Sequence, residues 1–173
     1  MYNTIDRNSF SLAKIRNNMK IIKANPEIPY MTLEEAEGFL KSKLNLYFST
    51  IDGTGDPNIQ PVWFYYDEDK KIITIVTGKM AKKTQNVQKR SNIYFCVEDA
   101  NCPYKGVKGK GIAKISEDPK VIMSTTERIS LKYLGTLEHP VAQSMTDRSK
   151  SGEGVVIEIY SKFFSTWDFG KMH

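Results

Sequence analysis

Residues 46–64 read LYFSTIDGTGDPNIQPVWF, and residues 77–86 read TGKMAKKTQN. The first segment is rich in β-branched and aromatic residues on either side of the turn residues 52–57, which predicts a β-hairpin. The second segment follows another β-rich run, 71–77, and leads into a helix with a hydroxyl, a glycine and several lysines. Cations, a hydroxyl and free backbone N–H groups at a helix start can together bind a phosphate. The two segments predict a β-rich fold with an anion site after its third strand.

The rest of the chain extends this pattern. Further strands are expected at 92–98, 104–115, 154–160 and 163–169, and helices at 11–22, 32–44, 118–135 and 140–145. The five strands up to residue 115 follow one another as in a meander, which implies antiparallel pairing, and closing the sheet into a barrel would remove its exposed edges. We expect an arm, 1–31, ahead of one mainly β domain with helices (α+β), 32–173.

Composition excludes several classes of protein. The 173 residues are 40% hydrophobic and 26% charged, and no stretch approaches the roughly 20 apolar residues of a membrane span. The N-terminus has no secretory signal, so we expect a cytoplasmic protein. The net charge of +5 comes mainly from lysines spread over several elements, which argues against a nucleic-acid partner. Two cysteines six residues apart fit neither a zinc site nor a disulfide framework.

The lysines after residue 77 are the strongest candidates for binding. Cations in the first turn of a helix oppose the helix dipole unless an anion is present. A solvated helix face is the alternative for a bare run of lysines, but the preceding Thr-Gly pair favours a phosphate site. We expect Lys83 to make the most direct contact and Lys82 the next, with Thr77 and Thr84 as hydroxyl partners.

Two aromatic segments are further candidates. Pro61, within Gln60-Pro61-Val62-Trp63, has no N–H and belongs at a sheet edge, where free backbone groups suit a flat heterocycle. The alternative is that Trp63 packs in the core and Pro61 marks a barrel corner. Trp167, beside a terminal cation, either closes over a ligand or plugs the barrel.

The sequence offers no side chains for hydrolysis or for a metal site. Its two histidines are His139, beside a proline, and His173, the last residue, so no Ser-His-Asp set or metal cluster can be assembled. Catalytic residues and metal ligands are therefore left unassigned.

Taken in order, these motifs resemble the pyridoxamine 5'-phosphate oxidase-like family, the flavin-binding split barrels. The similarity runs from Thr32 to Lys171. It rests on the order and spacing of the capped helix with Glu35, the 46–64 hairpin, the 77–86 segment, the Pro103 to Val107 strand, the 127–135 helix and the Trp167-Asp168 pair. The arm before Thr32 lies outside it. This likeness implies an antiparallel, six-stranded split β-barrel.

The resemblance also implies a homodimer with two cofactor sites, each built from both chains. By that likeness the strand Gln60 to Trp63 would line the isoalloxazine ring, and Thr77, Lys82, Lys83 and Thr84 would hold the phosphate. Trp167 could come from the neighbouring subunit. Hydride would pass through the ring of the cofactor, which accounts for the missing catalytic triad.

The sequence differs from the family pattern in one feature that bears on function. Vitamin B6 oxidases of the family carry a C-terminal arginine signature for the substrate phosphate, whereas no arginine follows Arg148 here. The sequence argues against vitamin B6 oxidation and is closer to the reductase-like branch. Three hypotheses remain: an FMN-dependent oxidoreductase acting on a small molecule, a reductase that uses the deazaflavin coenzyme F-420, and a non-catalytic carrier or sensor of flavin or haem.

Overall fold

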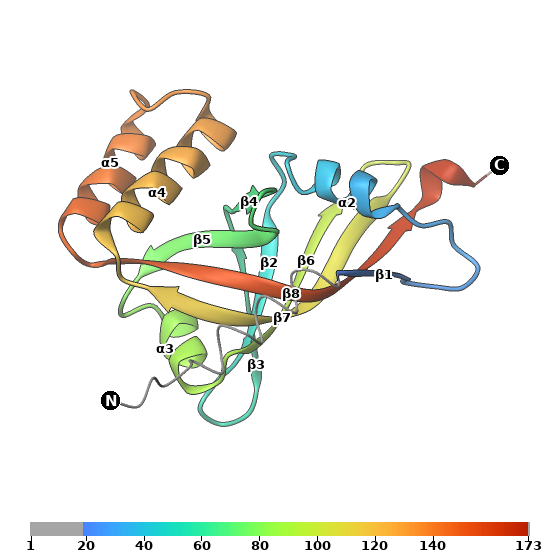
Figure 1. Ribbon diagram of the computed structural model, residues 1–173, viewed down its shortest axis with the longest axis horizontal. Coiled ribbons are helices and arrows are strands. Elements are labelled where there is room, and N and C mark those ends of the chain that lie inside the picture. The colour runs from blue at the N-terminus through green and yellow to red at the C-terminus, as the bar shows by residue number, and fades with distance from the viewer. Residues whose placement is uncertain (1–18, 173) are drawn as a thin grey trace, which may run out of the picture.

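The computed structural model describes residues 19–172, which form one curled antiparallel sheet with helices at its ends (Figure 1). The strands are β1 (Lys20–Lys23), β2 (Leu46–Ile51), β3 (Pro57–Val62), β4 (Tyr65–Asp67), β5 (Ile72–Gly78), β6 (Asn92–Asp99), β7 (Lys105–Ser116) and β8 (Gly154–Asp168). The helices are α2 (Leu33–Phe39), α3 (Lys82–Lys89), α4 (Pro119–Leu134) and α5 (Pro140–Lys150), with a 3-10 turn η1 (Phe169–Lys171) at the end. None of these helices is both long and apolar enough to cross a membrane.

The strand order explains why the sheet curls. Seven strands run β3-β2-β6-β7-β8-β5-β4, and β1 adds to β8 in parallel. Strands β3 and β4 are at opposite ends of this order, yet only Trp63 and Phe64 join them. Two linking residues span at most about 10 Å, so the ends of the sheet must approach each other. The α+β split-barrel class is thereby confirmed, and the sheet has eight strands where the resemblance implied six.

The meander order is wrong in two places. The third β-rich run, β5, pairs with β4 and β8 instead of with β3 or β6, because α3 carries the chain away from β5 before β6 begins. The expected strand 58–66 is broken at Trp63 and Phe64. The expected strands 154–160 and 163–169 form one strand, β8, with a register shift opposite Lys110 and Gly111. A β-bulge lets a long strand bend without ending.

The core is made by the inner face of the curled sheet. Phe48, Phe64 and Phe164 are the largest fully buried side chains, and Phe95 contacts Phe164 edge to face at 6.1 Å. Alternate residues of β2, Leu46, Phe48 and Thr50, are buried, as a half-buried strand requires. The opposite face of the same strands points away from this core.

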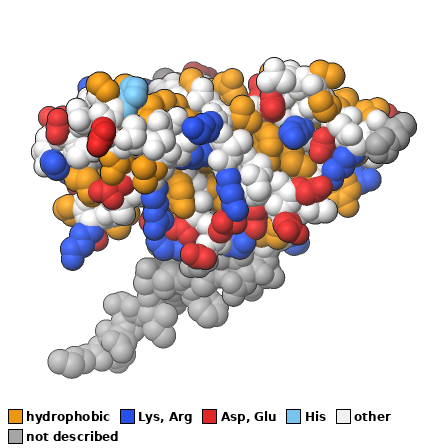
Figure 2. Space-filling view, turned by 90° about the horizontal axis from the view of Figure 1, so that it is seen from above, with side chains coloured by type: hydrophobic (Ala, Val, Ile, Leu, Met, Phe, Trp, Pro, Cys, Tyr) orange, Lys and Arg blue, Asp and Glu red, His pale blue; other side chains and the backbone are white. Residues whose placement is uncertain are grey.

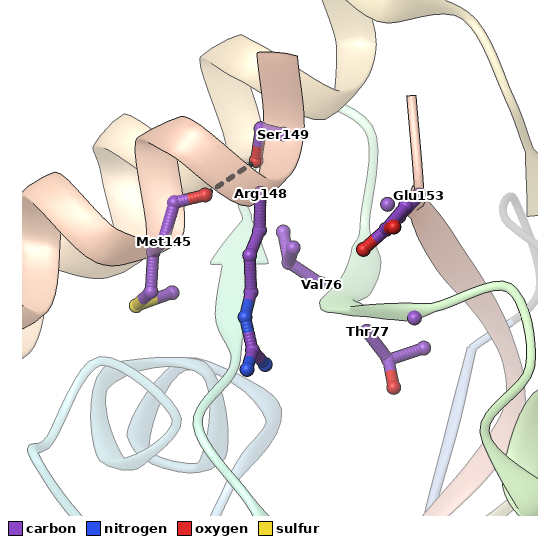
Figure 3. A pocket seen from close by; sticks show the side chains of 8 residues that line it. Val76, Thr77, Met145, Arg148, Ser149 and Glu153 are labelled. Atoms are coloured by element: carbon purple, nitrogen blue, oxygen red, sulfur yellow. Dashed lines mark hydrogen bonds between the residues drawn. The ribbon is translucent and has the colours of Figure 1, made fainter. Parts of the chain in front are cut away.

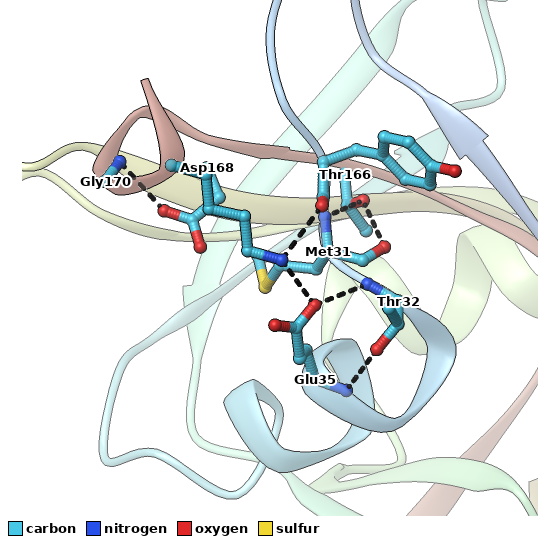
Figure 4. Close-up of polar contacts among 8 residues, drawn as sticks. Met31, Thr32, Glu35, Thr166, Asp168 and Gly170 are labelled. Carbon is cyan, nitrogen blue, oxygen red and sulfur yellow. Dashed lines mark hydrogen bonds and ion pairs between the residues drawn. The ribbon is translucent and has the colours of Figure 1, made fainter. Parts of the chain in front are cut away.

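Helix ends follow the expected capping signals. Thr32 and Glu35 form a capping box at the start of α2, which ends at Phe39, five residues before the expected end (Figure 4). Asp118 caps α4, and Gly135 ends it in the left-handed conformation with φ of 78°. Helix α5 runs to Lys150, five residues past its expected end.

The part of the arm within the described residues belongs to the sheet. Residues 11–18 of the expected first helix lie outside the described range, but Lys20–Lys23 are a strand, so the end of that helix prediction is wrong. The backbone continues along β8, where Thr166 exchanges hydrogen bonds with Met31 (Figure 4). Lys171, which follows β8, forms an ion pair of 2.6 Å with Glu35 of α2 and so joins the two segments.

Candidate functional site

The end of β5 and the start of α3 form the strongest candidate site, which we call the anion corner: Thr77, Gly78, Lys82 and Lys83. The ammonium of Lys83 lies 3.4 Å from the hydroxyl of Thr77. This is the one hydrogen bond of the Lys83 ammonium within residues 19–172, although the side chain is about half buried. Burial lowers the pKa of Lys83, because desolvation disfavours its charged form. An anion at this position would offset that cost.

The backbone at the start of α3 also suits an anion. Ala81 is the N-cap and provides no side-chain cap, and no acidic residue lies in the first turn. The N–H of Thr84 donates to the carbonyl of Ala81 at 2.9 Å, whereas the N–H groups of Lys82 and Lys83 have no partner within residues 19–172 and remain available to an anion. The anion corner therefore combines a poorly solvated ammonium, a hydroxyl and free backbone donors.

Two of the residues expected to bind phosphate, Thr84 and Lys82, do not face the space between Thr77 and Lys83. Thr84 is fully buried, and its hydroxyl donates to the carbonyl of Gly78 at 2.8 Å, so it holds the turn in shape. Lys82 is exposed and lies near Asp52, whose pKa is lowered to about 2 by hydrogen bonds from Thr54 and Asp56 and, to a smaller extent, by the charge of Lys82. Lys83 is thus the lysine that faces Thr77.

Strand β3 is an edge strand, as Pro61 requires, with β2 as its partner on one side. Gln60 and Val62 are paired with the buried residues Phe48 and Leu46, so they lie on the inner face of the sheet. Pro61 is exposed on the opposite face. Gln60 and Val62 can therefore face a ligand inside the curl, whereas Pro61 contributes only backbone.

Helix α3 connects this edge strand to the anion corner. Asn86 donates to Thr50 of β2 at 2.9 Å, and Thr50 pairs with Asn58 of β3. Lys83 and Asn86 are three residues apart, so they are neighbours on one helix face. The buried Oδ1 atom of Asn58 has no hydrogen-bond partner within residues 19–172. Sequence reasoning missed Asn58, because only the tertiary structure shows this unpaired acceptor beside the site.

Trp63 lies just after β3 and stacks on Tyr133 of α4, with ring centroids 4.7 Å apart and 4° between the planes. Phe64 is fully buried. Tyr133 holds the junction: its hydroxyl donates to the carbonyl of Leu44 at 2.8 Å and accepts from the N–H of Phe64 at 3.3 Å. This arrangement agrees with the alternative in which Trp63 is a packing residue.

Tyr133→Phe is expected to lower the free energy of unfolding by about 1–2 kcal/mol, since it leaves two partly buried backbone groups without a partner. Urea denaturation would measure this loss. Tyr30→Phe is the matched control, because the exposed hydroxyl of Tyr30 makes no hydrogen bond within residues 19–172. Equal effects of the two changes would contradict the proposed role of Tyr133.

Lys132 is a second unusual lysine, on the same helix. Its ammonium lies 3.5 Å from the centre of the Phe64 ring and 3.1 Å from the carbonyl of Leu40. Burial lowers the pKa of Lys132 to about 7, whereas the ring and the carbonyl favour the charged form and so limit the shift. The folded chain therefore releases this proton at lower pH than the unfolded chain does.

Stability should consequently rise with pH above 7, because the unfolded state retains the Lys132 proton up to the ordinary pKa of 10.5. We expect a gain of about 1–2 kcal/mol between pH 6 and 9, reduced from the full linkage because Lys132 is only partly buried. Lys132→Met should remove this part of the pH dependence, and Lys120→Met, on the exposed face of α4, should not. Parallel pH profiles for the two variants would contradict the account.

Trp167 lies far from the anion corner of its own chain. Thr77 pairs with Val155 near the start of β8, and twelve residues of extended strand, about 40 Å, separate Val155 from Trp167. Trp167 is 8% exposed and lies against Gly106, where a Cβ would come within 2.2 Å of the indole. It lines a cavity of about 280 Å³ with Tyr104, Phe169 and others. Trp167 and Lys83 therefore do not share a site within one chain.

Comparisons with known proteins identify relatives of this arrangement. Residues 32–159 match the family model described as pyridoxamine 5'-phosphate oxidase. A conserved hypothetical protein from Mycobacterium tuberculosis superposes with a TM-score of 0.73 at 22% identity, covering 88% of this chain and 95% of its own. An F-420 reductase gives a TM-score of 0.63 at 21% identity, covering 78% of this chain and 98% of its own.

A haem storage protein from Vibrio cholerae gives a TM-score of 0.58 at 12% identity, covering 75% of this chain and 89% of its own. No curated protein matches the chain in sequence. Because these solved structures are less than 25% identical to the chain, they show a shared fold. A reductase and a storage protein share it, so the fold alone does not decide the function.

Proposed function

The chain belongs to the pyridoxamine 5'-phosphate oxidase family, and on this premise we propose that it is a flavin-type oxidoreductase. The family generally binds flavin, and its members are typically dimers that bind small molecules. We propose FMN as the cofactor, with hydride passing to or from a small organic substrate. The observation that carries this proposal is the half-buried ammonium of Lys83 facing Thr77 at the uncapped start of α3.

The residues present fit such a cofactor. Lys83, Thr77 and the first backbone N–H groups of α3 would bind the phosphate, with Lys82 adding charge from the solvent side. Asn58 has an unpaired buried acceptor that suits an imide N–H, and Gln60 and Val62 would lie along the ring. When bound, the ring itself supplies the hydride chemistry, so the chain has to position it and exclude water.

A second copy of the chain would complete the site. Exposed hydrophobic side chains lie on the outer face of the sheet: Ile22, Tyr47, Ile59 and Tyr94. The strand registers place all four on the same face, opposite to Phe48 and Phe95. Lys108 and Lys110 lie on this face as well, and an exposed apolar cluster bordered by polar side chains marks an interaction surface. We propose that two copies pair through it, and that Trp167 of one copy reaches the cofactor of the other.

The deazaflavin alternative is supported by the likeness to an F-420 reductase. A haem carrier is less well supported. His139 is the one histidine within residues 19–172, and its Nδ1 accepts a hydrogen bond from Val141 at the start of α5. The neutral ring then carries its proton on Nε2, so neither nitrogen has a free lone pair for iron.

The test is to purify the protein and identify any bound chromophore by absorbance and mass. We expect a flavin or a deazaflavin. Turnover of the reduced cofactor with a panel of organic acceptors would then separate an enzyme from a carrier. Protein that contains no chromophore and takes up neither FMN nor deazaflavin on titration would contradict the proposal.

A further inference from the structure

A cavity of about 170 Å³ adjoins the anion corner, between the end of β5 and helix α5 (Figure 3). Thr77 and Gly78 line it on one side, and Met145, Arg148 and Ser149 of α5 line it on the other. Thr77 is therefore shared: its hydroxyl is 3.4 Å from Lys83, and its side chain also borders this cavity. A ligand held at Lys83 can thus extend into the cavity past Thr77.

The charged groups of the cavity are available for a ligand. Arg148 reaches in from α5, and Glu153 reaches in from the loop before β8 (Figure 3). Within residues 19–172, neither the guanidinium of Arg148 nor the carboxylate of Glu153 makes an ion pair. A guanidinium binds phosphate or carboxylate in a bidentate way, and a carboxylate accepts hydrogen bonds from hydroxyl groups.

The volume of the cavity and the two glycines that line it indicate that it holds one part of a larger ligand. Pockets for whole ligands enclose about 300–1,000 Å³, and this cavity is smaller. Gly78 and Gly154 are paired across β5 and β8, and both line it, so two residues without side chains leave room for close approach to the backbone. A Cβ added at Gly78 would meet no atom within 4 Å.

We propose that this cavity binds an acidic extension of the cofactor that carries hydrogen-bond donors, joined through the phosphate held at Lys83. Arg148 binds the second anionic group of that extension, and Glu153 accepts hydrogen bonds from its hydroxyl or amide N–H groups. This inference rests on the proposed function and makes it more specific. FMN, the cofactor proposed above, ends at its phosphate and does not reach this cavity. The inference therefore keeps the flavin-type function and favours, over FMN, a flavin or deazaflavin whose phosphate is esterified.

The experiment compares FMN, FAD and the deazaflavin coenzyme F-420 by fluorescence titration of the purified protein. We expect at least one of the two esterified cofactors to bind about tenfold or more tightly than FMN. Preference for FAD would identify a nucleotide extension, and preference for F-420 an acidic deazaflavin tail. The variants are Arg148→Gln, Glu153→Gln and the control Lys150→Gln, an exposed residue of α5 that does not line the cavity.

Arg148→Gln should weaken the preferred esterified cofactor about tenfold and leave FMN within about twofold, because an exposed charge that makes no contact contributes little. Glu153→Gln should weaken the esterified cofactor less, and Lys150→Gln should change nothing. Tight binding of FMN alone, or an equal effect of Arg148→Gln on all three cofactors, would overturn the extension and leave the proposed function intact. Binding of none of the three would overturn both.

Discussion

Replacing Lys83 by glutamine is expected to weaken FMN binding by about 1.5–3 kcal/mol, which is about 10- to 150-fold in the dissociation constant. The ammonium of Lys83 is half buried, and its one hydrogen bond is to Thr77 at 3.4 Å. A charge-assisted bond to phosphate in such a site is stronger than a bond at the surface. Isothermal titration or quenching of flavin fluorescence would measure the loss.

Two other lysines of α3 provide controls for this result. Lys89→Gln changes the same charge at the exposed far end of the helix and should leave the affinity nearly unchanged. Lys82→Gln should have a smaller effect than Lys83→Gln, because Lys82 lies toward Asp52. If all three variants bound FMN equally well, the phosphate would have to lie elsewhere.

The second large effect is expected when two defective chains are combined. In the proposed homodimer, Lys83→Gln removes the ammonium that binds the phosphate, and Trp167→Leu removes the indole that the other copy contributes. Each variant alone should therefore bind the cofactor much more weakly than the wild type. When the two variants are unfolded and refolded together in equal amounts, half of the dimers contain one chain of each kind. Each mixed dimer has one intact site, so about a quarter of all sites should recover full affinity.

Recovery depends on the two residues acting from different chains. If Lys83 and Trp167 served the same chain, every chain in the mixture would still carry one defect, and no site would recover. Circular dichroism of each variant checks that it folds, and Trp167→Phe, which keeps a ring against Gly106, is a second variant if the leucine is poorly tolerated. Absence of recovery with folded variants would remove Trp167 from the proposed site.

Local signals predicted much of the fold. The 46–62 hairpin follows from a cluster of turn residues between two β-rich runs, and the ends of α4 follow from Asp118 and Gly135. These features depend on residues that are neighbours in sequence. The pairing of β5 with β8 does not, since Thr77 and Val155 are far apart in the chain. No pattern in either strand specifies its partner.

Some residues of the candidate site could likewise be predicted from local sequence, and others could not. Thr77 and Lys83 were predictable because the turn between them is local. Asn58, Arg148 and Glu153 were not, because each becomes a site residue only when a distant element packs beside it. The stacking of Trp63 on Tyr133 likewise depends on the end of α4 packing beside the link between β3 and β4, which the sequence of β3 does not encode.

The most direct measurement is a titration of the purified wild-type protein with FMN and with riboflavin, which has the same ring and no phosphate. If the anion corner binds the phosphate, FMN should bind about tenfold or more tightly than riboflavin. Added inorganic phosphate should compete for the anion corner and so reduce the difference in affinity between FMN and riboflavin. Equal binding of FMN and riboflavin would contradict the central claim.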